Sequence, residues 1–179
     1  HAESGLPVDE VFTQVNAQLC ENNEAGMFVT AWMGILDLET GLIRYANAGH
    51  NPPVVRHKDG SYEYLKGRAN FVLAGMEGVR YKEQQLQLQQ GDEIYLYTDG
   101  VTEAHNVDKQ LFGEDRLLVS LNETAGMTVD EICRKVKADV DAFQGEAEQF
   151  DDITMLCVRL SEVENKMLSV SPKMETVSQ

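Results

Sequence analysis

The chain has 179 residues, of which 42% are hydrophobic and 25% are charged. This composition is typical of a globular protein with room for one domain and a core. The formal net charge of -15 argues against nucleic-acid binding, because a phosphate backbone needs a positive protein face. No apolar run approaches the roughly 20 residues that span a bilayer, and no signal peptide opens the chain. We expect a cytoplasmic segment without membrane contact, which leaves open a membrane anchor elsewhere in a longer parent protein.

The cysteines exclude some further classes of protein. Cys20, Cys133 and Cys157 are odd in number, widely spaced and set among apolar neighbours. A zinc site would need paired spacing, and a secreted protein would use its cysteines in disulfides. We therefore expect buried free thiols in a reducing compartment.

The first half of the chain predicts one helix and several short strands. Apolar residues recur with helical period over residues 7–20, with Pro7 in the first turn. Residues 27–38 and 42–48 are strand-like and are joined by a short turn, which predicts an antiparallel hairpin. A second hairpin is expected from residues 54–57 and 62–65, and residues 84–88 alternate as a strand with one wet face does.

The central stretch of the chain is a buried strand that ends on a carboxylate. Gly91-Asp92 forms a turn, and the β-branched, aliphatic and aromatic residues of 94–97 predict a strand. The strand stops at Thr98-Asp99-Gly100, where we expect a tight turn. A charge held at a rigid strand end is a common position for a ligand of a hard metal ion.

The last part of the chain supplies two further carboxylates. Residues 112–118 predict a loop entering a short helix, and Thr128 with Glu131 has the spacing of a capping box at the start of a longer helix. Asp151 and Asp152 then precede a strand over residues 153–160. Asp99 follows its strand, so antiparallel pairing of the two strands would bring these carboxylates together.

Gathered carboxylates repel one another unless a cation or a proton lies between them. Oxygen ligands at Asp99, Asp151 and Asp152 favour Mg²⁺ or Mn²⁺ over zinc. Two such ions can share a water, lower its pKa and orient it for attack on phosphorus. The residues alone leave a second interpretation open, in which Asp151 and Asp152 are a solvated acidic pair without a metal.

Four motifs, at residues 45–53, 96–104, 112–117 and 150–154, occur in this order along the chain. Together they resemble the SpoIIE/RsbU-type branch of the metal-dependent (PPM) serine/threonine protein phosphatases. The resemblance implies an α+β fold, an α-β-β-α sandwich of two antiparallel sheets flanked by helices, with a binuclear Mn²⁺ or Mg²⁺ centre between the sheets. It also implies that a phosphorylated anti-anti-sigma (STAS) protein is the substrate, in the partner-switching control of bacterial sigma factors.

The resemblance also implies site residues. Asp99 and Asp151 match the family's metal-binding and catalytic aspartates, and Asp152 is a further candidate ligand. His50 is a candidate general acid, although its position in a Gly-His-Asn loop favours a structural role. We expect His57 and His105 to be surface residues. Glu103 could approach the metals, but we expect a solvated position or one at the start of a helix.

The chain departs from the family pattern at its beginning. The family's domain starts with strands that carry an Asp-Gly segment, whose aspartate bridges both metals, and residues 1–6 contain no aspartate. We therefore expect residues 1–160 to be the C-terminal portion of a phosphatase domain with little activity of its own, and residues 161–179 to be a linker or the start of a following module. Exposed sheet edges would favour a homodimer. The alternative is a non-catalytic module that binds the same regulatory partner.

Overall fold

The computed structural model describes residues 5–21, 23–58 and 60–161. The expected linker or module at 161–179 lies outside the described residues, apart from Ser161. The helices are α1 (Val8–Cys20), α2 (Asp99–Thr102), α3 (Gly113–Asn122) and α4 (Val129–Gln144). The strands are β1 (Ala31–Leu36), β2 (Leu42–Ala48), β3 (Val54–Arg56), β4 (Tyr62–Tyr64), β5 (Gln84–Gln87), β6 (Glu93–Tyr97) and β7 (Met155–Arg159).

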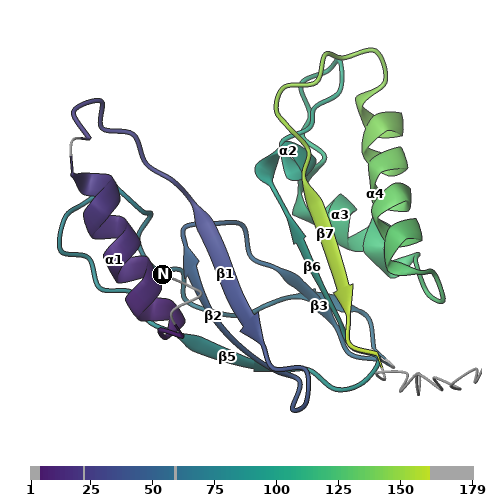
Figure 1. Ribbon diagram of the computed structural model, residues 1–179. Helices are drawn as coiled ribbons and strands as arrows, with labels where there is room; N and C mark the ends of the chain where they lie inside the picture. The colour runs from purple at the N-terminus through teal and green to yellow at the C-terminus, as the bar shows by residue number, and fades with distance from the viewer. Residues whose placement is uncertain (1–4, 22, 59, 162–179) are drawn as a thin grey trace, which may run out of the picture.

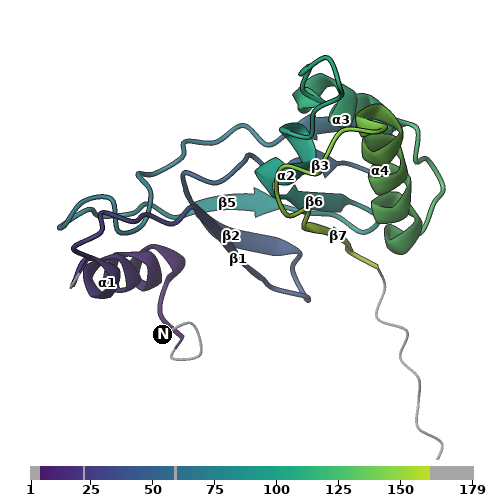
Figure 2. The ribbon, with the colours of Figure 1, turned by 90° about the horizontal axis from the view of Figure 1, so that it is seen from above.

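The strands form two antiparallel sheets that lie between helices. One sheet has the order β1-β2-β5 and the other β4-β3-β6-β7. Helix α1 packs on the first sheet, and α4 packs on β7 of the second. Figure 1 shows the layers from left to right as α1, the β1-β2-β5 sheet, the sheet that contains β6 and β7, and α4. Figure 2 shows α1 and α4 on opposite sides of the two sheets. This arrangement confirms the predicted α-β-β-α sandwich.

Three hydrophobic clusters correspond to the three contacts between layers. Val8 and Phe12 of α1 pack with Ala46 and Ala48 of the first sheet. A second cluster lies between the sheets and contains Ile43, Tyr45, Val55, Leu88 and Ile94. The third joins the second sheet to α3 and α4, and its fully buried members include Tyr95, Leu117, Leu121, Val136 and Val140. Burying apolar surface contributes about 25 cal/mol per Å², so these contacts hold the layers together.

The helix boundaries agree with the sequence signals. Pro7 occupies the N-cap position of α1, where its missing N–H costs nothing. The predicted capping box is present at α4: the Glu131 N–H donates to Thr128 Oγ1 over 3.3 Å, and the Thr128 N–H donates to Glu131 Oε2 over 2.8 Å. Both hairpins pair as expected, β1 with β2 and β3 with β4.

Two local predictions were wrong in detail. The first strand begins at Ala31 rather than at residue 27, because β2 ends at Ala48 and leaves no strand for residues 27–30 to pair with. Val29 instead forms an isolated bridge with Leu73. Asp99, which we expected in a tight turn, is instead the first residue of the short helix α2.

The cysteines are free, as expected, but only Cys157 is buried; Cys20 and Cys133 are half-buried. Burial raises the pKa of the Cys157 thiol to about 12, so it is protonated at neutral pH. Among the described residues, no helix has the length and apolar character needed to cross a membrane.

Candidate functional site

Hydrogen bonds join the C-terminal end of β6 to the N-terminal end of β7 beside the predicted carboxylates. The last pair of the ladder joins Tyr97 to Met155. Beyond it, the Thr98 N–H donates to the Thr154 carbonyl and the Thr154 N–H donates to Thr98 Oγ1, each over 3.0 Å. Thr98 Oγ1 also donates to the Asp152 carbonyl over 3.0 Å. The residue after Thr98 is Asp99, so these bonds hold it next to the Asp151-Asp152 segment.

A close backbone approach brings the same two segments still nearer. Gly100 is buried in α2, and a Cβ added there would lie 2.3 Å from the Asp152 carbonyl oxygen. It would also lie 3.3 Å from the carbonyl oxygen of Asp151. Only glycine permits this contact, because any side chain would overlap the facing backbone. The start of α2 therefore rests directly on the segment that precedes β7.

The three carboxylates are exposed and carry no counter-charge. Asp99, Asp151 and Asp152 are all solvent-exposed, and among the described residues none of them forms an ion pair with a cationic side chain. Asp151 Oδ1 accepts the Asp152 N–H over 2.7 Å, and the Asp151 carbonyl accepts Gln149 Nε2 over 2.9 Å. Such bonds order the segment while leaving carboxylate oxygens available for a ligand.

The carboxylates do not by themselves complete a metal site. The described part of the chain contains no group of three or more His, Cys, Asp or Glu side chains arranged to hold a metal ion. The oxygen-only donors suit Mg²⁺ or Mn²⁺ in kind. Further oxygen ligands are needed to make up the six that such ions prefer.

His50 lies within electrostatic reach of Asp99. Burial lowers the pKa of His50, and the negative charge of Asp99 opposes that shift. The His50 N–H donates to Asn47 Oδ1 over 2.7 Å, and Asn47 Nδ2 donates to the His50 carbonyl over 2.8 Å. The loop is thus held by its backbone, while the half-buried ring lines a cavity of about 240 Å³ that Arg68 also lines.

The other candidates lie apart from the carboxylates or in solvent. His57 is exposed as expected, with its ring paired to Asp92 over 2.8 Å. His105 is half-buried rather than a plain surface residue, because its ring packs edge-on against Phe150 at a centroid distance of 5.9 Å. Glu103 is exposed at the C-terminal end of α2. The expectation that Glu103 is solvated agrees with this position, although it ends a helix rather than starting one.

Sequence reasoning missed the residues that position the carboxylates. The sequence predicts a tight turn at Thr98 and Gly100 and a motif that includes Thr154, whereas the structure shows that these residues hold the two segments together. The available signal was Thr98, a hydroxyl residue directly after a buried strand and directly before Asp99, since a threonine side chain readily bonds a nearby backbone. The contact of Gly100 with Asp152 had no signal in the sequence, because it joins residues far apart in the chain.

The chain is similar in sequence to known bacterial proteins. A model of the family described as Stage II sporulation protein E (SpoIIE) matches residues 1–161. Protein IcfG of Synechocystis is 33% identical over 139 residues, which are 77% of this chain and 22% of IcfG. The phosphoserine phosphatase RsbU of Bacillus subtilis is 27% identical over 158 residues, which are 88% of this chain and 46% of RsbU. The chain therefore spans less than half the length of either relative.

The fold is also similar to that of a solved domain. The SiaA-PP2C domain of Pseudomonas aeruginosa superposes with a TM-score of 0.73 at 22% identity, covering 84% of this chain and 60% of that domain's chain. This likeness concerns the fold, and it agrees with the two-sheet sandwich described above. With the family match over residues 1–161, it follows that the chain belongs to the SpoIIE family.

Proposed function

We propose that the chain is part of a metal-dependent protein serine/threonine phosphatase. Its substrate is a phosphorylated anti-anti-sigma (STAS) regulator in bacterial partner-switching signalling. The observation that carries the proposal is the fastening of Asp99 to the Asp151-Asp152 segment through Thr98 and Thr154. The relative RsbU, described as a phosphoserine phosphatase, supports the same reaction class.

Asp99 and Asp151 would hold the metal ions, with Asp152 as a further candidate. Bound Mn²⁺ or Mg²⁺ would supply a water of lowered pKa and a positive charge that attracts phosphate. The described residues offer these carboxylates without a complete ligand group. We therefore expect weak metal affinity and little phosphatase activity from this chain alone.

The chain's own residues would set the geometry of this reaction. Thr98 and Thr154 fix the distance between the segments that carry Asp99 and Asp151. Gly100 allows the closest approach of their backbones. The two hydrogen bonds between the His50 backbone and the Asn47 side chain would hold the His50 loop, with its partly buried ring, beside Asp99.

Calorimetric titration with Mn²⁺ tests the proposal. The chain should bind Mn²⁺, and Asp99→Asn and Asp151→Asn should each abolish binding, because each removes a carboxylate ligand. Asp115→Asn is the matched control, since Asp115 is an exposed aspartate in α3. Binding that survives both changes would refute the assigned ligands. Hydrolysis of p-nitrophenyl phosphate and of a serine-phosphorylated STAS protein, with and without Mn²⁺, tests the reaction itself.

The second candidate function is a non-catalytic module that binds the same regulatory partner. The incomplete ligand group favours it. Such a module would bind the STAS protein with an affinity that does not depend on Mn²⁺ or on the two aspartates. Pull-down of the phosphorylated and unphosphorylated STAS protein by the wild type and by Asp99→Asn distinguishes the two functions.

A further inference from the structure

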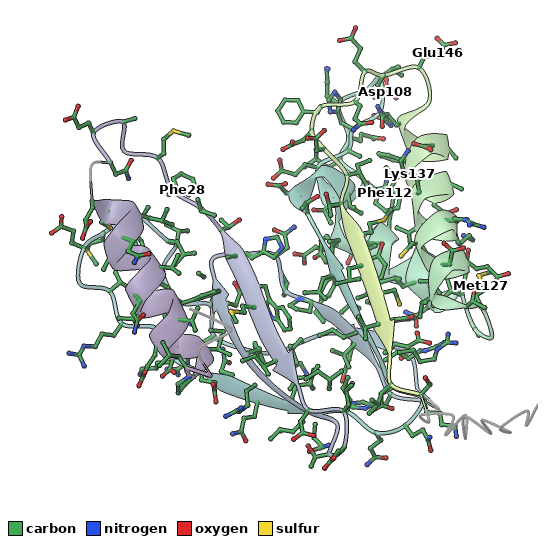
Figure 3. All side chains as sticks on the ribbon, viewed as in Figure 1. Phe28, Asp108, Phe112, Met127, Lys137 and Glu146 are labelled. Carbon is green, nitrogen blue, oxygen red and sulfur yellow. The ribbon has the colours of Figure 1, made fainter. Side chains whose placement is uncertain are left out.

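A groove lies between two loops beside the proposed site. One loop connects α2 to α3 and the other connects α4 to β7, and together they line a hollow of about 500 Å³. Figure 3 shows Asp108 and Glu146 on these neighbouring loops, above α2. We call this hollow the loop groove. The residues that line it and enter the argument are His105, Val107, Lys109, Glu148, Gln149 and Phe150.

The loop groove is built from loops that are held by hydrogen bonds. Asn106 Oδ1 accepts the N–H groups of Asp108 and Gln110 over 3.1 and 3.0 Å. A bridge between His105 and Leu111 closes this loop at its base. In the other loop, Gln144 Nε2 donates to the Ala147 carbonyl over 2.9 Å. The groove is therefore formed before any ligand arrives, which lowers the entropic cost of binding.

Two large apolar side chains, Val107 and Phe150, lie exposed among the polar residues that line the loop groove. Phe150 is 71% exposed and Val107 is 67% exposed. Large apolar side chains gathered around a hollow mark an interaction site more often than scattered ones do. An aliphatic side chain of a ligand would gain apolar contact against both.

The two loops that form the groove carry more acidic than basic side chains, and of the acidic ones Glu148 lines the groove itself. Glu148 is exposed, and among the described residues it forms no ion pair, while Asp108 and Glu146 lie on the same two loops. The one lysine there, Lys109, places its Nζ 3.1 Å from His105 Nε2. Within a chain of net charge -15, this groove complements a basic ligand, and complementary charge confers specificity.

The loop groove ends at the proposed site. Phe150 directly precedes Asp151, and Gln149 Nε2 donates to the Asp151 carbonyl over 2.9 Å. A polypeptide that brings a phosphorylated residue to Asp99 and Asp151 can therefore lay its neighbouring residues in the groove. We propose that the loop groove binds the segment flanking the phosphorylated residue of the protein substrate, and that it selects an apolar side chain followed by a basic one. This inference rests on the proposed function.

Matched phosphoserine peptides test this inference on the full chain with Mn²⁺ present. Three peptides differ only in the residues flanking phosphoserine, which are Leu and Arg, Leu and Glu, or Ala and Ala. Fluorescence anisotropy should give the Leu/Arg peptide about fivefold tighter binding than the Leu/Glu peptide, as expected for one exposed charge pair. Glu148→Lys should reverse this order, and Val107→Asp should remove most of the advantage of Leu over Ala.

The matched control is Glu39→Lys, which makes the same charge change in the β1–β2 turn, far from the groove, and should keep the wild-type order. Equal binding of all three peptides, no binding of any, or an unchanged order in Glu148→Lys would overturn the inference. Mn²⁺ binding by the same chain and by its Asp99→Asn and Asp151→Asn variants is measured separately by calorimetry. Peptide binding in the expected order, together with Mn²⁺ binding that survives both aspartate changes, would contradict the proposed function and leave the groove assignment standing.

Discussion

Thr98 and Thr154 exchange two hydrogen bonds of 3.0 Å, one between their backbones and one from the Thr154 N–H to the Thr98 hydroxyl. The same hydroxyl donates to the Asp152 carbonyl. One side chain thus continues the β6–β7 ladder past its last pair and fastens the segment that carries Asp151. The spacing of the two predicted ligand segments depends on this hydroxyl.

Thr98→Val should loosen that connection. Valine keeps the shape of threonine but can neither accept from Thr154 nor donate to Asp152. We expect the free energy of unfolding to fall by about 1 to 2 kcal/mol and Mn²⁺ affinity to fall with it. Urea denaturation and calorimetry measure the two effects. Thr98→Ser retains the hydroxyl and is the control; a Ser variant as impaired as the Val variant would contradict the role of the hydrogen bonds.

Gly100→Ala should disturb the site by steric overlap. The new Cβ would lie 2.3 Å from the Asp152 oxygen, so α2 and the 151–152 segment must move apart. We expect a loss of about 1 to 3 kcal/mol in stability, as in other overpacked positions, together with loss of Mn²⁺ binding. Gly60→Ala is the control, because its Cβ would meet only an ordinary contact at 3.5 Å. Unchanged Mn²⁺ binding in Gly100→Ala would show that the close approach is not needed.

The elements of this fold were largely predictable, because short-range patterns specify them. The apolar period of α1, the capping box at Thr128 and the short turns of both hairpins are each contained within a few residues. The same holds for the proximity of Asp99 to the Asp151-Asp152 segment, which required only that a strand end and a strand start be neighbours. Their roles as metal ligands stay predictions.

The details that failed depend on contacts between distant segments. Residues 27–30 have strand-like composition, but where β1 begins is set by where its partner β2 ends. His105 looked like a surface residue because nothing near it in sequence reveals that Phe150 packs on its ring. The conformation of Asp99 as the start of α2 likewise depends on packing of Gly100 and Val101, which are buried.

Acid should weaken the fold through Asp92. Burial alone would raise the pKa of this carboxyl, but bonds from the Gln89 and Lys58 N–H groups and from His57 together hold it below its ordinary value of 3.8. A lowered pKa in the folded state means that the stabilisation is complete above pH of about 4 and is lost as the pH falls further. Asp92 is 2% exposed, so the bonds are sheltered from solvent.

Asp92→Asn isolates this contribution. At pH 7 the variant should be less stable than the wild type by about 1 to 3 kcal/mol, because hydrogen bonds to a charged group are lost. The difference should be constant from pH 7 down to a pH of about 4 and should shrink as the pH falls further. Urea denaturation of both proteins across that range measures it, with Asp115→Asn as an exposed control. A difference that does not shrink at the acid end of the range would contradict the assignment.

The edge strands should lead the chain to self-associate. β1 and β7 are edge strands of their sheets. Leu156 of β7 is 54% exposed and lies on the same strand face as Val158 and Leu160, which pack toward the other sheet. Unpaired backbone beside exposed apolar side chains favours pairing with a second copy.

We expect a concentration-dependent dimer in sedimentation equilibrium, and we expect Leu156→Lys to weaken it about tenfold, because a buried leucine contributes about 1.5 to 3 kcal/mol. Leu38→Lys, at a leucine that is 68% exposed in the β1–β2 turn, should leave the dimer intact. A chain that stays monomeric at every concentration, or a Leu156→Lys variant that dimerises like the wild type, would show that these edges are protected, and the homodimer prediction would be wrong.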